Sequence, residues 1–263
     1  MNRFFDDLRE VWHYRGLLRM LVERDLKTRY RNSVLGVAWS FLQPLGMMLV
    51  FSVMATLINV SPRPNNHVFV LAGLLAWNFF SASVVGGTGS IVANSALVKK
   101  VYFPRLILPI SVVISSLVNY LLALPVYLVV ALASGQPLHG TLLLLPIVIL
   151  IQVVFSVGIS FMLATVNVFY RDTQFILDLA MLALFFLTPI WYSLDDTKAA
   201  TYAVWLRRLN PMASFVNIYQ DLMYWGNVTI AIFWIRTSLT AIIILILGYI
   251  IFTRYSPRFG EEV

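Results

Sequence analysis

Six long apolar segments constrain most strongly what this chain can fold into. Each is about as long as the roughly 20 residues that cross the hydrocarbon core of a bilayer. A backbone in lipid must satisfy its hydrogen bonds internally, so every span is expected to be an α-helix. The pattern predicts an all-α polytopic membrane protein with six transmembrane helices, at residues 34–58, 67–88, 106–132, 142–169, 174–193 and 231–252.

The charged residues agree with this class of protein. They make up 12% of the 263-residue chain, about half the share of a soluble domain. With six spans, the segment before the first span, the second and fourth loops and the C-terminal tail lie on the same side of the membrane. Together these segments hold 14 of the 19 lysines and arginines. Basic residues accumulate in cytoplasmic loops, so both termini are expected in the cytoplasm. The net charge of +7 then indicates a membrane surface rather than nucleic acid as the partner.

The N-terminal region differs from the spans. Residues 1–32 are expected to form a cytoplasmic interfacial segment, ahead of a six-span domain at residues 33–263. Within the first, residues 4–26 place apolar side chains at mostly helical spacing between charges, which predicts an amphipathic helix interrupted at Gly16. A membrane anchor and a partner-docking surface explain this helix equally well. Charges without an apolar core at the start argue against a cleaved signal peptide.

The loop after the second span, residues 94–105, is too apolar for a solvated linker. Asn94 or Ser95 is expected to cap a short helix that Pro104 ends. Such a helix suits a contact surface for another subunit, although topology alone also explains the positive charge of the loop.

The connection between the fifth and sixth spans, residues 195–229, is long for a structureless loop. Pro211 after Asn210 favours a helix start. The apolar stretch that follows is too short to span a bilayer. We expect two short re-entrant helices in the outer leaflet, with an outer cap as the alternative.

Several classes of function lack the residues they need. There is no phosphate-binding loop with its lysine, and the glycine-rich stretch at 86–90 is better explained by close helix packing. Only Asp178 lies well inside a span, which argues against ion-coupled transport. Cysteine is absent and the three histidines lie outside the span centres, so no catalytic residue and no metal site is predicted. Asp195–Asp196 faces outward, which disfavours a membrane glycosyltransferase.

Neutral polar and aromatic side chains remain inside the spans. Each buried amide is most simply a contact between helices, worth about 0.6 kcal/mol. Together the amides also suit a path for a polar, uncharged cargo, and aromatic faces suit sugar rings. Gly158 and Ser160 are expected to serve packing. The amides are Gln43, Asn78, Asn119, Gln152 and Asn167.

The segment LVERDLKTRYRNSVLGVAWSFLQPLGMMLVF, residues 21–51, resembles the start of the ABC-2 type permeases that export cell-surface polysaccharides. That family joins an interfacial helix to its first span through a basic motif. The matching residues here are Arg24-Asp25-Leu26-Lys27, Arg29-Tyr30, Ser33, Leu35-Gly36 and Trp39. Further matches are LVKKVYFPR at 97–105, FYRD at 169–172, PIWY at 189–192 and NP at 210–211.

The resemblance implies a permease subunit in the bacterial cytoplasmic (inner) membrane that forms a homodimer with two copies of a separate ABC ATPase. ATP and magnesium would bind to that ATPase, so this chain would need no cofactor. The implied cargo is a polysaccharide on polyprenyl pyrophosphate, such as O-antigen. An ABC-2 exporter of a teichoic acid precursor, a drug or a lipid stays open as an alternative, and so does an energy-independent channel.

The resemblance also implies three groups of site residues. Binding of the lipid pyrophosphate or headgroup would fall to Arg29, Arg31, Ser33, Gly36, Lys99, Lys100 and Arg105. The ATPase subunit would contact Arg24, Asp25, Val98, Tyr102, Arg171 and Asp172. The glycan channel and its gate would be lined by Trp77, Phe80, Asn119, Tyr120, Trp191 and Tyr192.

Overall fold

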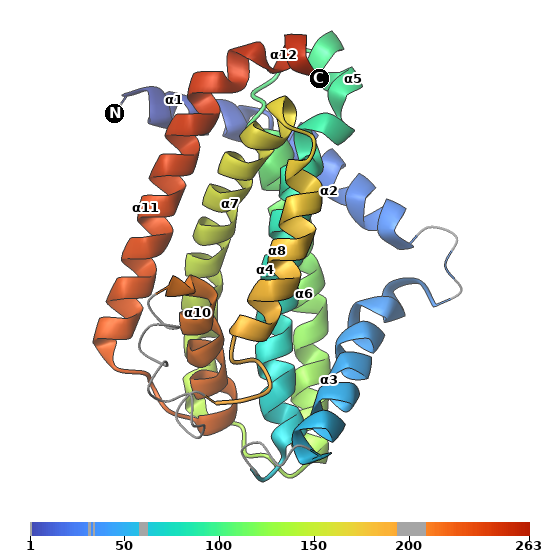
Figure 1. The fold of residues 1–263 in the computed structure, drawn as a ribbon, viewed down its shortest axis with the longest axis vertical. Coiled ribbons are helices and arrows are strands. Elements are labelled where there is room, and N and C mark those ends of the chain that lie inside the picture. The colour runs from blue at the N-terminus through green and yellow to red at the C-terminus, as the bar shows by residue number, and fades with distance from the viewer. Residues whose placement is uncertain (1, 31–32, 34, 58–62, 194–208) are drawn as a thin grey trace.

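The computed structural model describes residues 2–30, 33, 35–57, 63–193 and 209–263, and within these ranges it contains helices and no strand (Figure 1). The all-helical prediction is confirmed for this part of the chain. Five of the described helices are long and apolar enough to cross a membrane. They are α3 (Trp39–Leu57), α4 (Asn66–Ala93), α6 (Ile107–Ala133), α7 (Leu145–Phe169, preceded by the short helix η2, Gly140–Leu144) and α11 (Ala231–Tyr255).

The segment predicted as the fifth span, residues 174–193, contains a shorter helix. This is α8 (Thr173–Leu187), an apolar helix of 15 residues. It ends early because Pro189 disfavours helical backbone at the residue before it. Thr188 is accordingly extended, with φ −99° and ψ 132°.

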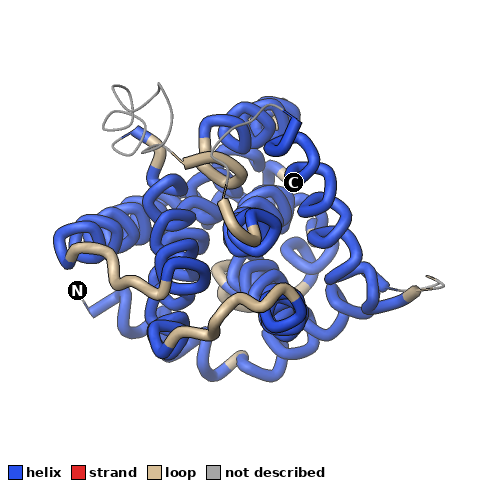
Figure 2. The backbone as a smooth tube through the Cα atoms, turned by 90° about the horizontal axis from the view of Figure 1, so that it is seen from below, coloured by secondary structure: helices blue, strands red, loops and turns tan. Residues whose placement is uncertain are grey.

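The long helices lie side by side, and both chain termini lie at the same end of the bundle, called here the terminal end (Figure 1). Figure 2 views the helices from below, nearly end-on, with their connecting loops. Most side chains of α4 are buried, whereas in α3 only Pro44, Met48 and Ala55 are. Helix α4 is therefore the centre of the core, and α3 lies at its edge.

Glycines set the closest helix contacts, as the sequence predicts. A Cβ atom on Gly87 would overlap the Ser160 side chain, and one on Gly158 would overlap the backbone of α11 at Leu245. Small residues let helices approach closely in membranes, where packing rather than hydrophobicity drives association. The packing role of the glycine-rich stretch and of Gly158 and Ser160 is confirmed.

The N-terminal segment forms two helices, α1 (Asn2–His13) and α2 (Arg15–Tyr30), which lie across the terminal end (Figure 1). The interruption falls at Tyr14, so the expected break at Gly16 is wrong by two residues. Backbone hydrogen bonds from Tyr14 to Glu10 (3.0 Å) and from Leu18 to Tyr14 (3.1 Å) cross it. Gly16 is accommodated inside α2, because one glycine costs a helix only about 1 kcal/mol.

Two short elements complete the terminal end. After α4, helix α5 (Ser95–Lys100) has six residues, so the expectation that the helix continues to Pro104 is wrong. Val101 already adopts extended backbone. The Asn94 side chain does not cap α5, because it donates to Ser90 O (2.8 Å) instead. The chain ends with η4 (Ser256–Arg258) and α12 (Phe259–Glu262).

The opposite end of the bundle holds α10 (Pro211–Gln220), followed by the single π-helical turn η3 (Asp221–Trp225). The helix start expected at Asn210–Pro211 is confirmed, since Asn210 Oδ1 accepts a hydrogen bond from Met212 N at 3.0 Å. Most of α10 is buried. The first of the two short helices expected in this connection falls largely on residues 194–208, which lie outside the described part of the chain.

Candidate functional site

Two adjoining cavities run along α4 and α6. The larger, called here the deep cavity, has a volume of about 530 Å³ and is lined by α3, α4, α6 and α8. The entrance cavity, of about 490 Å³, is lined by α2 and the terminal-end parts of α4 and α6. Arg29, Ser116 and Asn119 line both, so the two form one groove, the α4–α6 groove.

Helical periodicity explains why these side chains meet. On α6, Ser116, Asn119, Tyr120 and Ala123 all line the deep cavity. Their spacing of i, i+3, i+4 and i+7 places them on one helix face. Asn78 and Ala82 repeat this spacing on α4. Ser116 is not among the site residues expected from the sequence, and this periodicity is the signal that points to it.

The amides of the spans divide into two groups. Gln152 Nε2 donates to Ala76 O at 2.9 Å and Asn167 Nδ2 to Thr88 O at 3.1 Å, so these two join α7 to α4. The other three line the deep cavity: Gln43, Asn78 and Asn119. The structure therefore supports both interpretations of the amides, each for a different subset.

Ser116 presents a buried hydroxyl to the groove. The residue is 2% exposed, and its Oγ has no hydrogen-bond partner among the described residues. An unsatisfied buried polar group costs about 1–3 kcal/mol. Such a group is satisfied by water or by a ligand hydroxyl where the site is polar and roomy.

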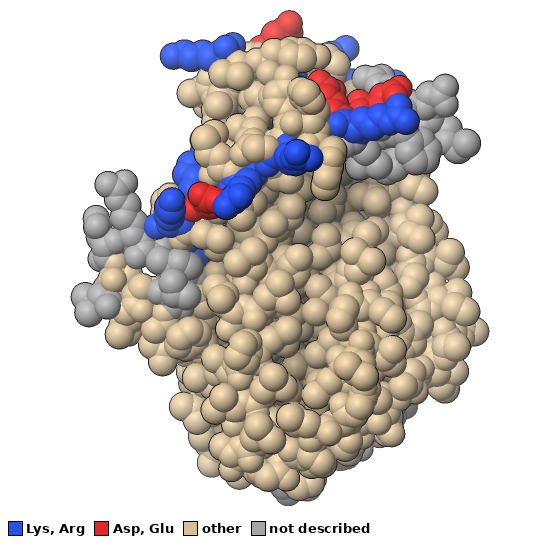
Figure 3. Space-filling view, turned by 180° about the vertical axis from the view of Figure 1, so that it is seen from behind, with Lys and Arg blue, Asp and Glu red and all other residues tan. Residues whose placement is uncertain are grey.

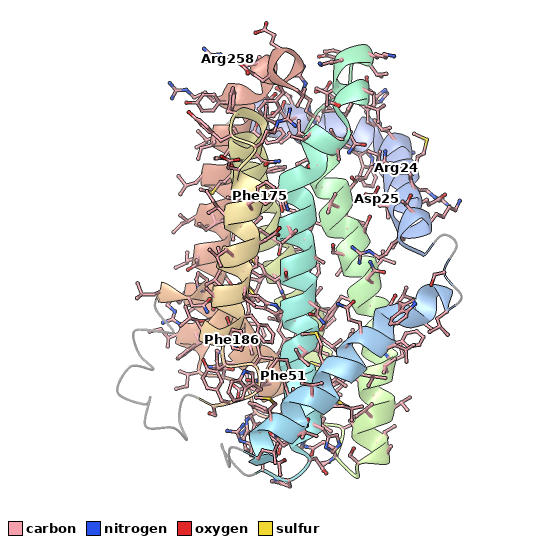
Figure 4. The ribbon with its side chains drawn as sticks, turned by 45° about the vertical axis from the view of Figure 1, so that its right-hand side comes forward. Arg24, Asp25, Phe51, Phe175, Phe186 and Arg258 are labelled. Atoms are coloured by element: carbon pink, nitrogen blue, oxygen red, sulfur yellow. The ribbon has the colours of Figure 1, made fainter. Side chains whose placement is uncertain are left out.

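Charges gather at the entrance. Arg24 NH2 lies 2.9 Å from Asp25 Oδ1, and Arg24 NH1 donates to Asn94 Oδ1 at 2.8 Å. The bond to Asn94 holds α2 against the turn between α4 and α5, and Figure 4 shows Arg24 and Asp25 on α2. Arg29 forms no ion pair with any described residue. Among the described residues that line the groove, its guanidinium is therefore the cation available to an anion.

The remaining residues expected at the lipid pyrophosphate do not all join this groove. Lys99 and Lys100 are exposed on α5 and line neither cavity. The Ser33 hydroxyl accepts a hydrogen bond from Gly36 N at 3.2 Å, and Gly36 has φ +51°. These two shape the turn into α3, where a positive φ favours glycine. Arg31 lies outside the described residues.

Arg105 occupies a different site. Its NH1 donates to the backbone carbonyl of Ser256, which ties the start of α6 to the chain end. It lines a third cavity of about 310 Å³ together with Asp7 and Glu10. Burial lowers the pKa of the Arg105 guanidinium, although arginine remains charged in proteins. The structure does not bring Arg105 together with Arg29.

The other residues expected to contact an ATPase lie outside the membrane-length helices. Tyr102 is 85% exposed, and Arg171 and Asp172 are exposed on the turn between α7 and α8. Val98 is only 5% exposed and belongs to a cluster with Phe103 and Phe259. As an apolar side chain facing this cluster, Val98 packs α5 onto the bundle and presents no contact surface.

Of the aromatic residues expected along the channel, Tyr120 lines the groove, whereas Trp77 and Phe80 are buried in the core. Trp77 and Phe80 are 4% and 3% exposed, and their rings pack against Phe185 (5.6 Å between centroids) and Phe155 (5.7 Å). They face the core and do not line the groove, unlike Tyr120. Trp77 and Phe80 lie on α4, the central helix of the core, and their rings are therefore buried among other apolar side chains.

Trp191 and Tyr192 lie after α8, toward the end opposite the termini. The Trp191 ring stacks on Phe51 of α3, with centroids 6.2 Å apart. Tyr192 OH donates to Phe186 O at 3.1 Å. Figure 4 shows Phe51 on α3 and Phe186 on α8. The pair therefore lies where the ends of α3 and α8 meet.

Hydrogen bonds join the chain that follows α8 to α10 and its cap residue Asn210. Asn210 Nδ2 donates to Thr188 Oγ1 at 2.8 Å. Gln220 Nε2 lies 3.1 Å from both Pro189 O and Ile190 O. Helix α10 is thereby held against the chain that leaves α8.

The surface shows where a bilayer fits. On the face shown in Figure 3, lysine, arginine, aspartate and glutamate gather toward the terminal end, and uncharged side chains cover the rest. Exposed leucine and isoleucine residues along α8 and α11 continue this uncharged surface. The molecule thus has the surface of a multi-pass membrane protein.

Comparison with known families decides the assignment. Residues 16–224 match the family model of the ABC-2 type transporter. The chain belongs to the ABC-2 type transporter family. Membership of this family implies that the ABC-2 protein has an ABC ATPase as its partner. It also confirms the resemblance that the sequence motifs indicate.

Individual relatives agree. The ABC-2 protein is 37% identical over 256 residues to the O-antigen export system permease protein RfbA of Myxococcus xanthus. The aligned region covers 97% of this chain and 98% of the relative. It is 32% identical over 249 residues to a protein of the same name from Klebsiella pneumoniae, covering 93% and 94%. It is 24% identical over 215 residues to the polysialic acid transport protein KpsM of Escherichia coli, covering 78% and 80%.

Proposed function

We propose that this ABC-2 protein is the permease subunit of an ATP-driven transporter that exports polyprenyl-pyrophosphate-linked polysaccharide of the O-antigen class across the inner membrane. The observation that carries the proposal is a groove with a free cation at its entrance and amides along its wall, in a chain matched almost end to end by O-antigen export permeases. Such a groove suits a cargo with an anionic group and a hydroxyl-rich chain.

In this proposal the chain crosses the membrane six times, with both termini in the cytoplasm. The terminal end would then be the cytoplasmic end. The shared position of the two termini and the excess of basic residues there support this orientation (Figure 1). Helix α8, together with the extended chain up to Tyr192, would make the fifth crossing. Helix α10 would be re-entrant from the outer side.

The pyrophosphate would enter at the cytoplasmic mouth of the groove. Guanidinium groups bind phosphate through paired, charge-assisted hydrogen bonds, and Arg29 is available for this contact. Arg31, Lys99 and Lys100 would add to the positive field near the inner headgroups. Ser33 and Gly36 would act indirectly, by setting the turn into α3, which lines the deep cavity.

The glycan would follow the polar wall of the deep cavity. Ser116, Asn119 and Asn78 offer donors and acceptors for sugar hydroxyls, and the Tyr120 ring offers an aromatic face. Trp191 and Tyr192 would shape the exit. A second copy of the chain would close the open side of the groove, in a homodimer.

ATP hydrolysis would take place on a separate subunit. Two copies of an ABC ATPase would bind ATP and magnesium and dock on the cytoplasmic end, against Tyr102, Arg171 and Asp172. Arg24, paired with Asp25 on the same helix, would transmit movement between this surface and the groove, since it joins α2 to the α4–α5 turn.

Affinity purification of the tagged protein from its native membrane, followed by mass spectrometry, tests the proposal. We expect a stoichiometric ATPase subunit and a polyprenyl-linked glycan in the same sample. Recovery of the chain without any ATPase in several mild detergents would contradict the proposal and favour an energy-independent channel.

A further inference from the structure

The deep cavity is lined mostly by uncharged side chains. Of the described residues that line it, Arg29 of α2 and Asp178 of α8 are the charged ones. Figure 4 shows these two helices on either side of α4 and α6. Asp178 is exposed and has no ion pair among the described residues. A carboxylate and a guanidinium therefore flank the cavity without neutralising each other directly.

Ring contacts fix the level of Asp178. Phe185 of α8 packs against Trp77 of α4, with centroids 5.6 Å apart. Asp178 lies seven residues before Phe185, and Val85 lies eight residues after Trp77. Each is therefore roughly 10–12 Å from that contact along its helix. Because α8 runs away from the terminal end and α4 toward it, Asp178 lies level with Val85 (Figure 1).

This level is the junction of the two cavities. Gly86, the neighbour of Val85, lines the entrance cavity, whereas Val85 itself lines the deep cavity. A chain that passes from one cavity to the other crosses the level of Asp178, which lines the deep cavity there. The groups beyond it are uncharged: Asn78, Tyr120 and Gln43.

We propose that Asp178 is a charge-selectivity residue, which makes the groove accept polysaccharides of neutral sugars and reject those of acidic sugars. The inference rests on the proposed function and narrows its substrate class. With the pyrophosphate bound at Arg29, the guanidinium is neutralised and Asp178 remains as the fixed charge at the junction. Uronic or sialic acid units would meet like charge there, and specificity of this kind comes from such repulsion. Rings of carboxylates act on anions in the same way in channels.

The experiment uses the purified complex of the chain with its ATPase in lipid nanodiscs. The probes are two polyprenyl-pyrophosphate-linked oligosaccharides of equal length, one of neutral hexoses and one in which alternate hexoses are hexuronic acids. We expect the neutral probe to bind at least about tenfold more tightly, since like charges about 6 Å apart at a protein surface repel by more than the equivalent of a tenfold change in affinity.

Two variants and one control sharpen the test. Asp178→Asn should bring the affinities of the two probes close together by improving binding of the acidic one, and Asp178→Lys should reverse the preference. Glu261→Gln removes an exposed carboxylate from α12, away from the groove, and should keep the wild-type ratio. Asp178 is exposed, so neither substitution disturbs the core.

The outcomes separate the inference from the function on which it rests. Equal binding of the two probes by the wild type, or an unchanged ratio in Asp178→Asn, would overturn the selectivity role alone. Binding of neither probe by a complex that retains its ATPase would overturn the proposed glycan cargo, and the selectivity with it.

Discussion

Gly158 of α7 and Gly248 of α11 face each other so closely that a Cβ atom on Gly248 would overlap the carbonyl group of Gly158. No side chain separates the two backbones at this point. Gly248 is one of the four buried residues of α11, with Thr237, Ala241 and Phe252, so this contact lies within the seam that holds α11 to the bundle.

Substitution of Gly248 by valine should therefore destabilise the bundle. The added atoms meet backbone, which cannot move aside, and overpacking typically costs about 1–3 kcal/mol. The melting temperature in detergent, measured by loss of the monodisperse size-exclusion peak, should fall by several degrees. Gly46→Val is the matched control, because a Cβ atom at Gly46 in α3 meets nothing within 4 Å. Equal melting temperatures for the two variants would contradict the packing role.

Substitution of Asn210 by alanine should loosen α10. It removes the bond to Thr188 Oγ1 (2.8 Å) and the helix cap at Met212 N (3.0 Å). Loss of such a cap costs about 1–2 kcal/mol. Hydrogen exchange of the α10 amides should become faster, while that of α7 stays unchanged. Asn227→Ala, at an exposed position, serves as the control. Unchanged α10 protection would show that packing alone holds this helix.

Charge removal at Arg29 should reduce export by about tenfold or more, since a hydrogen bond to a charged group is worth about 1.5–3 kcal/mol. Membrane insertion should be unaffected, because Arg29 makes no ion pair with the described residues. Surface glycan, measured in cells that express Arg29→Gln in place of the native chain, reports export. Lys27→Gln, on the same helix but outside the lining of both cavities, should keep wild-type export.

The double variant Lys99→Gln/Lys100→Gln should show a smaller loss of export than Arg29→Gln. Its lysines lie outside the groove and act through the field near the headgroups, which salt screens within about 10 Å. Transport into vesicles should therefore become less salt-dependent in this variant. Wild-type export in both the double variant and Arg29→Gln would exclude a pyrophosphate role for either group.

Two substitutions of buried polar residues should differ in their effect on stability. Gln152→Ala removes the bond to Ala76 O and should lower the melting temperature, by an amount that corresponds to about 0.6 kcal/mol or more.

Ser116→Ala removes a buried hydroxyl without a partner among the described residues, and should leave stability unchanged or raise it. It should nevertheless weaken binding of a glycan probe. A destabilised Ser116→Ala variant would indicate that the hydroxyl has a structural partner.

The site was only partly visible in the sequence. Arg29 and Asn119 were identified from motif and position, and both line the groove. Trp77 and Val98 were expected at functional surfaces and are buried instead. Which face of an almost uniformly apolar helix points inward is not encoded in hydropathy, so these two could not be placed without their neighbours.

By itself the sequence determined the membrane class, the approximate positions of the five membrane-length helices and the family, because apolar length and a long motif are local properties of the chain. The tertiary structure decided which polar groups meet. Gln152 and Asn119 are both amides within apolar helices, yet one joins α7 to α4 and the other lines a cavity. Their difference depends on how neighbouring helices are rotated, which is set by close packing at residues such as Gly87 and Gly158. A glycine in the sequence indicates a close contact, but the partner that it meets and the rotation of the two helices cannot be read from either segment alone.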